Sequence, residues 1–101
     1  MTAVVSPQLL KALTDLTGEI HLDSALRIVT QDAIAHRLES IAKQLQTLEQ
    51  KYGMSFEQFD VRFQAEEFPN QYSYEVEQDY LGWEGLLCRQ RRLQEVGDWL
   101  R

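Results

Sequence analysis

A run of thirty residues without glycine or proline, from Asp23 to Tyr52, constrains the fold of this chain more than any other feature. Within it, apolar side chains recur at alternating steps of four and three residues, which is the spacing of a coiled-coil seam. The seam consists of Ile34, Leu38, Ile41, Leu45 and Leu48. A helix of about 30 residues is roughly 45 Å long, whereas a compact domain of about 100 residues has a radius of gyration of only about 13 Å. We therefore expect the seam to mediate self-association with a second copy, giving a homodimer. The alternative is an internal hairpin with the C-terminal helix.

Capping signals divide the rest of the chain into shorter helices. Ser6 and Gly18 bracket a first helix, Ser55 and Gln58 form a capping box, and Ser73 can cap a last helix. We predict an all-α fold of three to four helices, arranged as a helical hairpin or bundle within a single domain over 1–101. The predicted segments are an N-terminal helix and connector over 1–22, a long helix over 23–52, a short helix over 55–67 and a C-terminal helix over 73–100.

Charge and composition narrow the classes of function. The formal net charge is −6, which disfavours the binding of nucleic acid by the chain alone. The sequence lacks the apolar run of about 18 residues that a membrane span requires, and Met1–Val5 shows no sign of a signal peptide. A single cysteine is consistent with a reducing cytosol, so we expect a cytoplasmic protein. The basic cluster of Arg89, Arg91 and Arg92 is either a solvated face or a contact for an acidic surface or nucleic acid.

Residue types that perform catalysis are sparse. His21 and His36 are 15 residues apart, and no second cysteine completes a metal set with them. Cys88 has no histidine close in sequence to activate its thiol. Glycine-rich phosphate loops and nucleophile motifs are also missing from the sequence. We therefore expect no catalytic residue, no metal and no cofactor, and a chain that is not an enzyme.

The segment 53–85 combines most of the aromatic residues with half of the acidic ones. It holds eight of the ten aromatic rings, and its eight carboxylates against one arginine give a net charge of −7. Such a surface suits a small basic protein, because rings supply apolar contact area and carboxylates supply a negative potential. The expected partner-binding residues are Phe56, Phe59, Phe63, Tyr72, Tyr74, Glu75, Glu77, Asp79, Tyr80, Trp83 and Glu84. The alternative is that the phenylalanines of the short helix are simply part of the core.

Two blocks within this segment resemble a family of small bacterial and archaeal antitoxin-like proteins that is common in cyanobacteria. Residues 52–59 read YGMSFEQF and residues 72–84 read YSYEVEQDYLGWE, while the family carries KYGMSFEEF followed by YSYEVEQDYWEWE. The resemblance extends over roughly residues 23–88. This chain departs from the family pattern at Leu81 and Gly82, where the family has a Trp-Glu pair, and in its first 20 residues.

The resemblance implies a non-catalytic module that binds and neutralises a small toxin-like protein, often encoded beside it. Toxins that cut RNA are usually basic in their substrate groove, so the acidic segment would occupy that groove in place of phosphates. A function of a different class stays open. It is a self-associating helical scaffold, in which the seam forms a homodimer and all of the rings are internal.

Overall fold

The computed structural model describes residues 5–101, and every regular element within that range is an α-helix. These residues form four helices, which are α1 (Pro7–Thr17), α2 (Leu22–Tyr52), α3 (Phe56–Gln64) and α4 (Tyr74–Trp99). The prediction of an all-α fold with one helix of about 30 residues is confirmed. The first four residues of the predicted segment 1–22, and with them most of the stretch judged for a signal peptide, lie outside the described residues.

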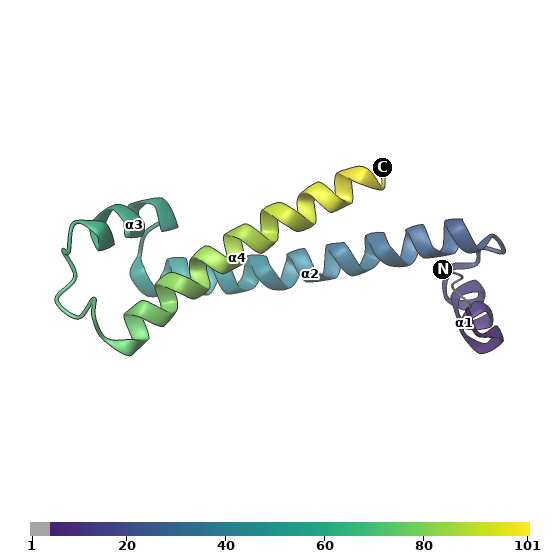
Figure 1. Cartoon of the computed structure of the whole chain (residues 1–101), viewed down its shortest axis with the longest axis horizontal. Coiled ribbons are helices and arrows are strands. Elements are labelled where there is room, and N and C mark those ends of the chain that lie inside the picture. The colour runs from purple at the N-terminus through teal and green to yellow at the C-terminus, as the bar shows by residue number, and fades with distance from the viewer. Residues whose placement is uncertain (1–4) are drawn as a thin grey trace.

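Helices α2 and α4 run antiparallel as a hairpin, and α3 closes one end of it (Figure 1). We call the end that contains α3 and the connector 65–73 the closed end, and the opposite end the open end. At the open end, Arg27 and Gln31 of α2 donate hydrogen bonds to the carbonyl oxygen of Leu100 at 3.0 and 3.1 Å. The molecule measures 58 × 25 × 20 Å, so the long helix is accommodated by an elongated shape.

The coiled-coil seam of α2 packs against α4 of the same chain. Ile34, Ile41 and Leu45 are buried in one apolar cluster with residues of α4, and Leu38 and Leu48 are partly buried against it. In this structure, the seam therefore belongs to an internal hairpin with the C-terminal helix, which was the alternative prediction. The physical reason is the chain reversal at the closed end, which brings α4 back along the apolar face of α2. Self-association stays a prediction, and it requires a surface other than the seam.

Local capping sets most of the helix boundaries. The side chains of Ser6, Ser55 and Ser73 each accept a hydrogen bond from a backbone N–H in the first turn of the following helix. Gly18 and Gly53 end α1 and α2 in the left-handed conformation, with φ of 73° and 66°, which glycine adopts at little cost. The capping signals given by the sequence are therefore confirmed at both ends of α1 and at the start of α3 and α4.

Helix α3 ends at Gln64, three residues before its predicted end at 67. Glu66 adopts the left-handed conformation with φ of 56°. The N–H groups of Glu66 and Glu67 donate to the carbonyl oxygens of Phe63 and Arg62, which is the Schellman pattern of a helix end. Because this position usually holds glycine, a glutamate there gives no recognisable stop signal in the sequence.

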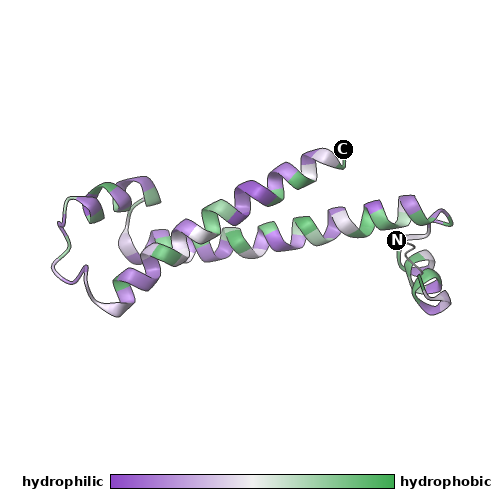
Figure 2. Ribbon diagram, in the orientation of Figure 1, coloured by the Kyte–Doolittle hydropathy of each residue, from purple (hydrophilic) through white to green (hydrophobic). Residues whose placement is uncertain are grey.

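At the open end, α1 packs on the start of α2, where Leu13 and Ala25 are buried. Many of the apolar side chains around them remain exposed, and apolar segments are visible along α1 in Figure 2. The exposed large apolar residues of this region are Leu9, Leu10, Leu16, Ile20, Leu22 and Leu26. Within the described range, none of the helices is both long enough and apolar enough to span a bilayer.

The core contains its largest fully buried side chains at the closed end. Phe59 of α3 is 0% exposed and Trp83 of α4 is 1% exposed, whereas Val61, two residues after Phe59 on the same helix, is 69% exposed. Phe59 therefore faces the hairpin and Val61 faces solvent.

We predict that Phe59→Ala lowers the free energy of unfolding by about 3–5 kcal/mol, because it removes a buried ring and leaves a cavity. Urea unfolding followed by circular dichroism measures this change. Val61→Ala is the matched control on the same helix, and its effect should stay within about 0.5 kcal/mol. Equal effects of the two substitutions would contradict the placement of α3.

Candidate functional site

Seven aromatic rings from α2, α3, α4 and the connector pack together at the closed end. The ring of Phe59 stands at the centre, 4.6 Å from the ring of Tyr52 and 5.3 Å from that of Trp83 between ring centroids. Tilted rings at these distances attract one another beyond the effect of area burial. The aromatic cluster consists of Tyr52, Phe56, Phe59, Phe63, Phe68, Tyr80 and Trp83. It joins three helices into one unit.

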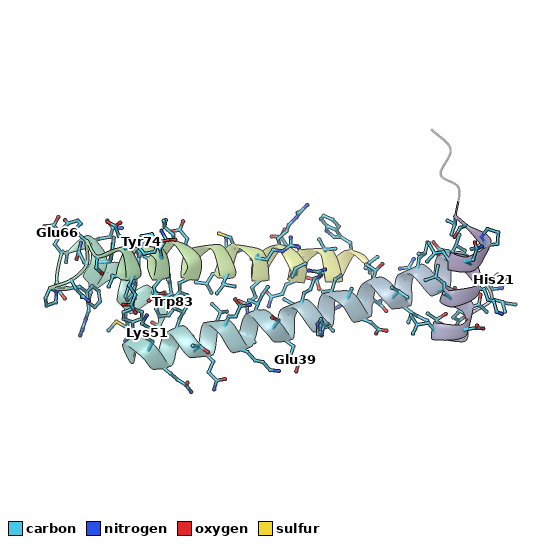
Figure 3. The ribbon with its side chains drawn as sticks, turned by 90° about the horizontal axis from the view of Figure 1, so that it is seen from below. His21, Glu39, Lys51, Glu66, Tyr74 and Trp83 are labelled. Carbon is cyan, nitrogen blue, oxygen red and sulfur yellow. The ribbon has the colours of Figure 1, made fainter. Side chains whose placement is uncertain are left out.

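Five of the predicted partner-binding residues belong to this aromatic cluster. Phe59 and Trp83 are fully buried, and Figure 3 shows Trp83 directed from α4 towards α2. A partner that binds the folded chain does not reach these two rings. Phe56, Phe63 and Tyr80 are partly buried against the same core. The alternative, in which the phenylalanines of the short helix are part of the core, therefore describes their position.

A network of charged and polar groups joins α2 to α4 beside the aromatic cluster. The Nζ of Lys51 lies 2.6 Å from Oε1 of Glu75 and 2.6 Å from Oδ2 of Asp79. The hydroxyl of Tyr52 donates to the same oxygen of Asp79 at 2.5 Å. Glu75 and Asp79, both predicted to bind a partner, are thus engaged within the chain, although the Glu75 side chain is still 70% exposed.

The geometry of this network explains the ionisation of its members. Burial, followed by the hydrogen bond to Asp79, raises the pKa of Tyr52 to about 12. Burial by itself would raise the pKa of Asp79, but the hydrogen bonds from Lys51 and Tyr52 outweigh it and hold that pKa below its ordinary value. The hydrogen bonds to Asp79 and Glu75 raise the pKa of Lys51. At neutral pH, Asp79 is therefore ionised while Lys51 and Tyr52 are protonated.

Two further tyrosines at the closed end are oriented by carboxylates. The hydroxyl of Tyr80 donates to Oδ1 of Asp60, and that of Tyr72 donates to Oε1 of Glu66, each at 2.6 Å. These hydrogen bonds are the main reason that the pKa of each tyrosine is raised. Tyr72 is nevertheless 70% exposed, so its ring is held in place at the surface.

One face of α4, pointing away from α2, carries acidic and apolar side chains that the hairpin does not use. Tyr74 and Leu81 are 79% and 60% exposed, and Figure 3 shows Tyr74 directed away from α2. The carboxylates of Glu77 and Glu84 form no ion pair with another residue in 5–101. Their spacing of three and four residues puts all four on one side of the helix. We call Tyr74, Glu77, Leu81 and Glu84 the α4 outer face.

Sequence reasoning missed Leu81 and Gln71. Leu81 follows Tyr74 by seven residues, so the same helical spacing could have assigned it to the α4 outer face. Gln71 is 3% exposed and donates from Nε2 to the carbonyl oxygen of Phe63 at 3.0 Å, which ties the connector to α3. No sequence signal identifies this role, because glutamine is usually found at the surface.

Residue types with catalytic chemistry lie apart from one another. In the part of the chain that the structure describes, no three histidine, cysteine, aspartate or glutamate side chains are grouped to hold a metal ion. His21 lies at the open end, while His36 and Cys88 lie on α2 and α4, and all three are exposed. The side chains that do gather, at the closed end, are the aromatic cluster and the network of Lys51, Tyr52, Glu75 and Asp79.

Comparison of the chain with models of protein families, with curated proteins and with solved structures finds no match.

We predict that Tyr52→Phe changes the pH dependence of stability between pH 10 and 12. Because the folded state raises the pKa of Tyr52 from its ordinary value of 10.0 to about 12, the protonated hydroxyl stabilises the fold below pH 10, and this contribution is lost as the pH rises to 12. Near pH 8, the variant should lose about 1 kcal/mol, since Asp79 keeps Lys51 but loses one hydrogen bond.

Urea unfolding at pH 8, 10 and 11.5 measures the effect, and Tyr74→Phe is the control because it removes the hydroxyl of a 79% exposed tyrosine. The wild type should lose more stability than Tyr52→Phe across this range. Parallel losses in the two proteins would contradict the assigned role of the hydroxyl.

Proposed function

We propose that this chain is a non-catalytic, antitoxin-like module that binds and neutralises a small basic protein at its closed end. The observation that supports this proposal most directly is the α4 outer face. There, two carboxylates without an ion-pair partner in residues 5–101 lie beside the exposed side chains of Tyr74 and Leu81. Apolar contacts flanked by charge are typical of specific protein interfaces.

The distribution of charge supports a basic partner. The net charge of −7 over residues 53–85 exceeds the −6 of the whole chain, and this segment forms α3, the connector and the first half of α4. Lys51 offsets part of it through Glu75 and Asp79. Concentrated charge of one sign accelerates the encounter with a partner of the opposite sign.

The buried rings support the same function indirectly. Because Phe59 and Trp83 fix α3 and α4 to α2, the α4 outer face belongs to a folded surface before any partner arrives. A surface of this kind loses little conformational entropy on binding. Neutralisation would follow if the acidic closed end occupies a substrate groove that otherwise receives the phosphates of RNA.

The proposal is tested by capturing partners with the tagged chain in cells of the source organism. The wild type should co-purify with one small protein rich in lysine and arginine at near-equal stoichiometry, and Glu77→Gln/Glu84→Gln should lose it. Glu39→Gln/Glu49→Gln is the control, because it removes the same charge from exposed positions of α2. Equal recovery with both double variants, or no basic protein with any of them, would overturn the proposal.

With the purified partner, we predict that Leu81→Ala weakens binding by about tenfold or more, since an apolar residue at the centre of an interface contributes more than its rim. Raising the salt concentration should slow association by about tenfold, because it screens the steering charges. Stopped-flow kinetics measures both effects. An association rate that is independent of salt would contradict electrostatic steering.

A self-associating scaffold is the second candidate, and the apolar surface of the open end favours it. Leu16 and Ile20 are 75% and 82% exposed among other exposed apolar side chains of this end, and a gathering of exposed apolar side chains marks an interaction surface. If this function is correct, light scattering should find a dimer that Leu16→Glu/Ile20→Glu converts to a monomer. Val61→Glu, at an exposed position of the closed end, should leave the dimer intact. A monomeric wild type would contradict this candidate.

A further inference from the structure

A hollow of about 210 Å³, open to solvent and lined by exposed polar side chains, lies between α2 and α4 along the middle of the hairpin. At roughly 30 Å³ for each water, this is room for about seven waters, or for a small ion with part of its hydration shell. Arg37, Ser40 and Gln44 line it from α2, and Arg89 lines it from α4. The apolar residues beneath are Ile41 and Leu93, both buried.

The polar groups of this hollow are rich in donors and include no carboxylate. The guanidinium groups of Arg37 and Arg89 have only N–H donors, and they suit the paired oxygens of phosphate and carboxylate. Ser40 and Gln44 add a hydroxyl and an amide. All four side chains stand on helices rather than loops, so their backbone positions are fixed relative to one another.

Four basic residues form no ion pair within residues 5–101, and Arg37 and Arg89 are the two of them that line this hollow. Acidic residues outnumber basic ones by 16 to 10, so carboxylates are in excess. Six basic residues of α2, α3 and the α4 region are paired with them, namely Arg27, Lys43, Lys51, Arg62, Arg92 and Arg101. Within residues 5–101, Arg37 and Arg89 have no carboxylate partner, although they line the same hollow and their like charges repel.

We propose that this hollow is a binding site for a small oxyanion of the phosphate class, either inorganic phosphate or the phosphate group of a small metabolite. Such an anion would offset the repulsion between Arg37 and Arg89 and accept hydrogen bonds from Ser40 and Gln44. A nucleic acid is a poorer match, because a chain of net charge −6 repels a long polyanion over most of its surface. The site is separate from the closed end and does not depend on the function proposed for it.

The test is a titration of the full chain, labelled with ¹⁵N, with inorganic phosphate at pH 7.5. Saturable shifts are expected for the amide groups of Ser40, Gln44 and Leu93 and for the arginine Nε–H groups of the hollow. Sodium chloride at equal ionic strength should not reproduce them. Arg37→Gln and Arg89→Gln should each weaken binding by about tenfold or more, since each removes a charged hydrogen-bond donor.

Arg91→Gln is the matched control, because Arg91 lies on the same helix, is exposed, has no ion pair within residues 5–101 and does not line the hollow. It should bind phosphate as the wild type does. A second titration with glycerol 3-phosphate distinguishes inorganic phosphate from the phosphate group of a metabolite. Tighter binding than phosphate assigns the site to a phosphorylated metabolite, and equal binding assigns it to free phosphate.

Two results would overturn the proposal. The first is a set of shifts that never saturates, or that Arg89→Gln leaves unchanged while the variant retains the wild-type circular dichroism spectrum. The second is tighter binding of a single-stranded RNA oligonucleotide that Arg91→Gln weakens as much as Arg89→Gln does. That result would reassign the arginines to a nucleic-acid surface.

Discussion

The packing of Phe59 against both Tyr52 and Trp83 is the contact on which the hairpin depends. Helix α3 has nine residues, too few to be stable in water alone, so its position comes from the ring that it buries. That position determines where the chain reverses and therefore which side of α2 receives α4. Burial of Ile34, Ile41 and Leu45 follows from the reversal. The network of Lys51, Tyr52 and Asp79 then joins the same two helices with hydrogen bonds at the edge of the cluster.

Because the core occupies one side of α4, the side chains on its other side are available for binding. Tyr74, Glu77, Leu81 and Glu84 have no role in the packing of the hairpin, and their exposure is a direct consequence of the helical period. The acidic closed end and the arginine-lined hollow are also separated along the hairpin. One end of the molecule thus offers negative charge with apolar contacts, while the middle offers positive charge over an apolar floor.

The positions of the helices were predictable from the sequence. Which surfaces of the helices pack against one another was not. The serine caps and the glycine stops depend on neighbouring residues, so the four helices could be located to within a few residues. The end of α3 at Gln64 was not predicted, because Glu66 adopts the left-handed conformation that glycine usually adopts at a helix end. The sequence did not show which helix packs against the seam of α2, since the heptad spacing fits a second copy of the chain and α4 equally well. Likewise, Phe59 and Tyr74 belong to the same aromatic segment, and only the packing of three helices distinguishes the buried ring from the exposed one.

Hydrogen exchange of the chain with and without its co-purified basic protein reports where the partner covers the backbone, and it therefore tests binding at the closed end. We predict added protection over residues 74–88 of α4 and unchanged exchange over residues 7–26 at the open end. Protection confined to residues 7–26, or protection that grows with the concentration of the chain alone, would contradict this prediction and would favour a self-associating scaffold.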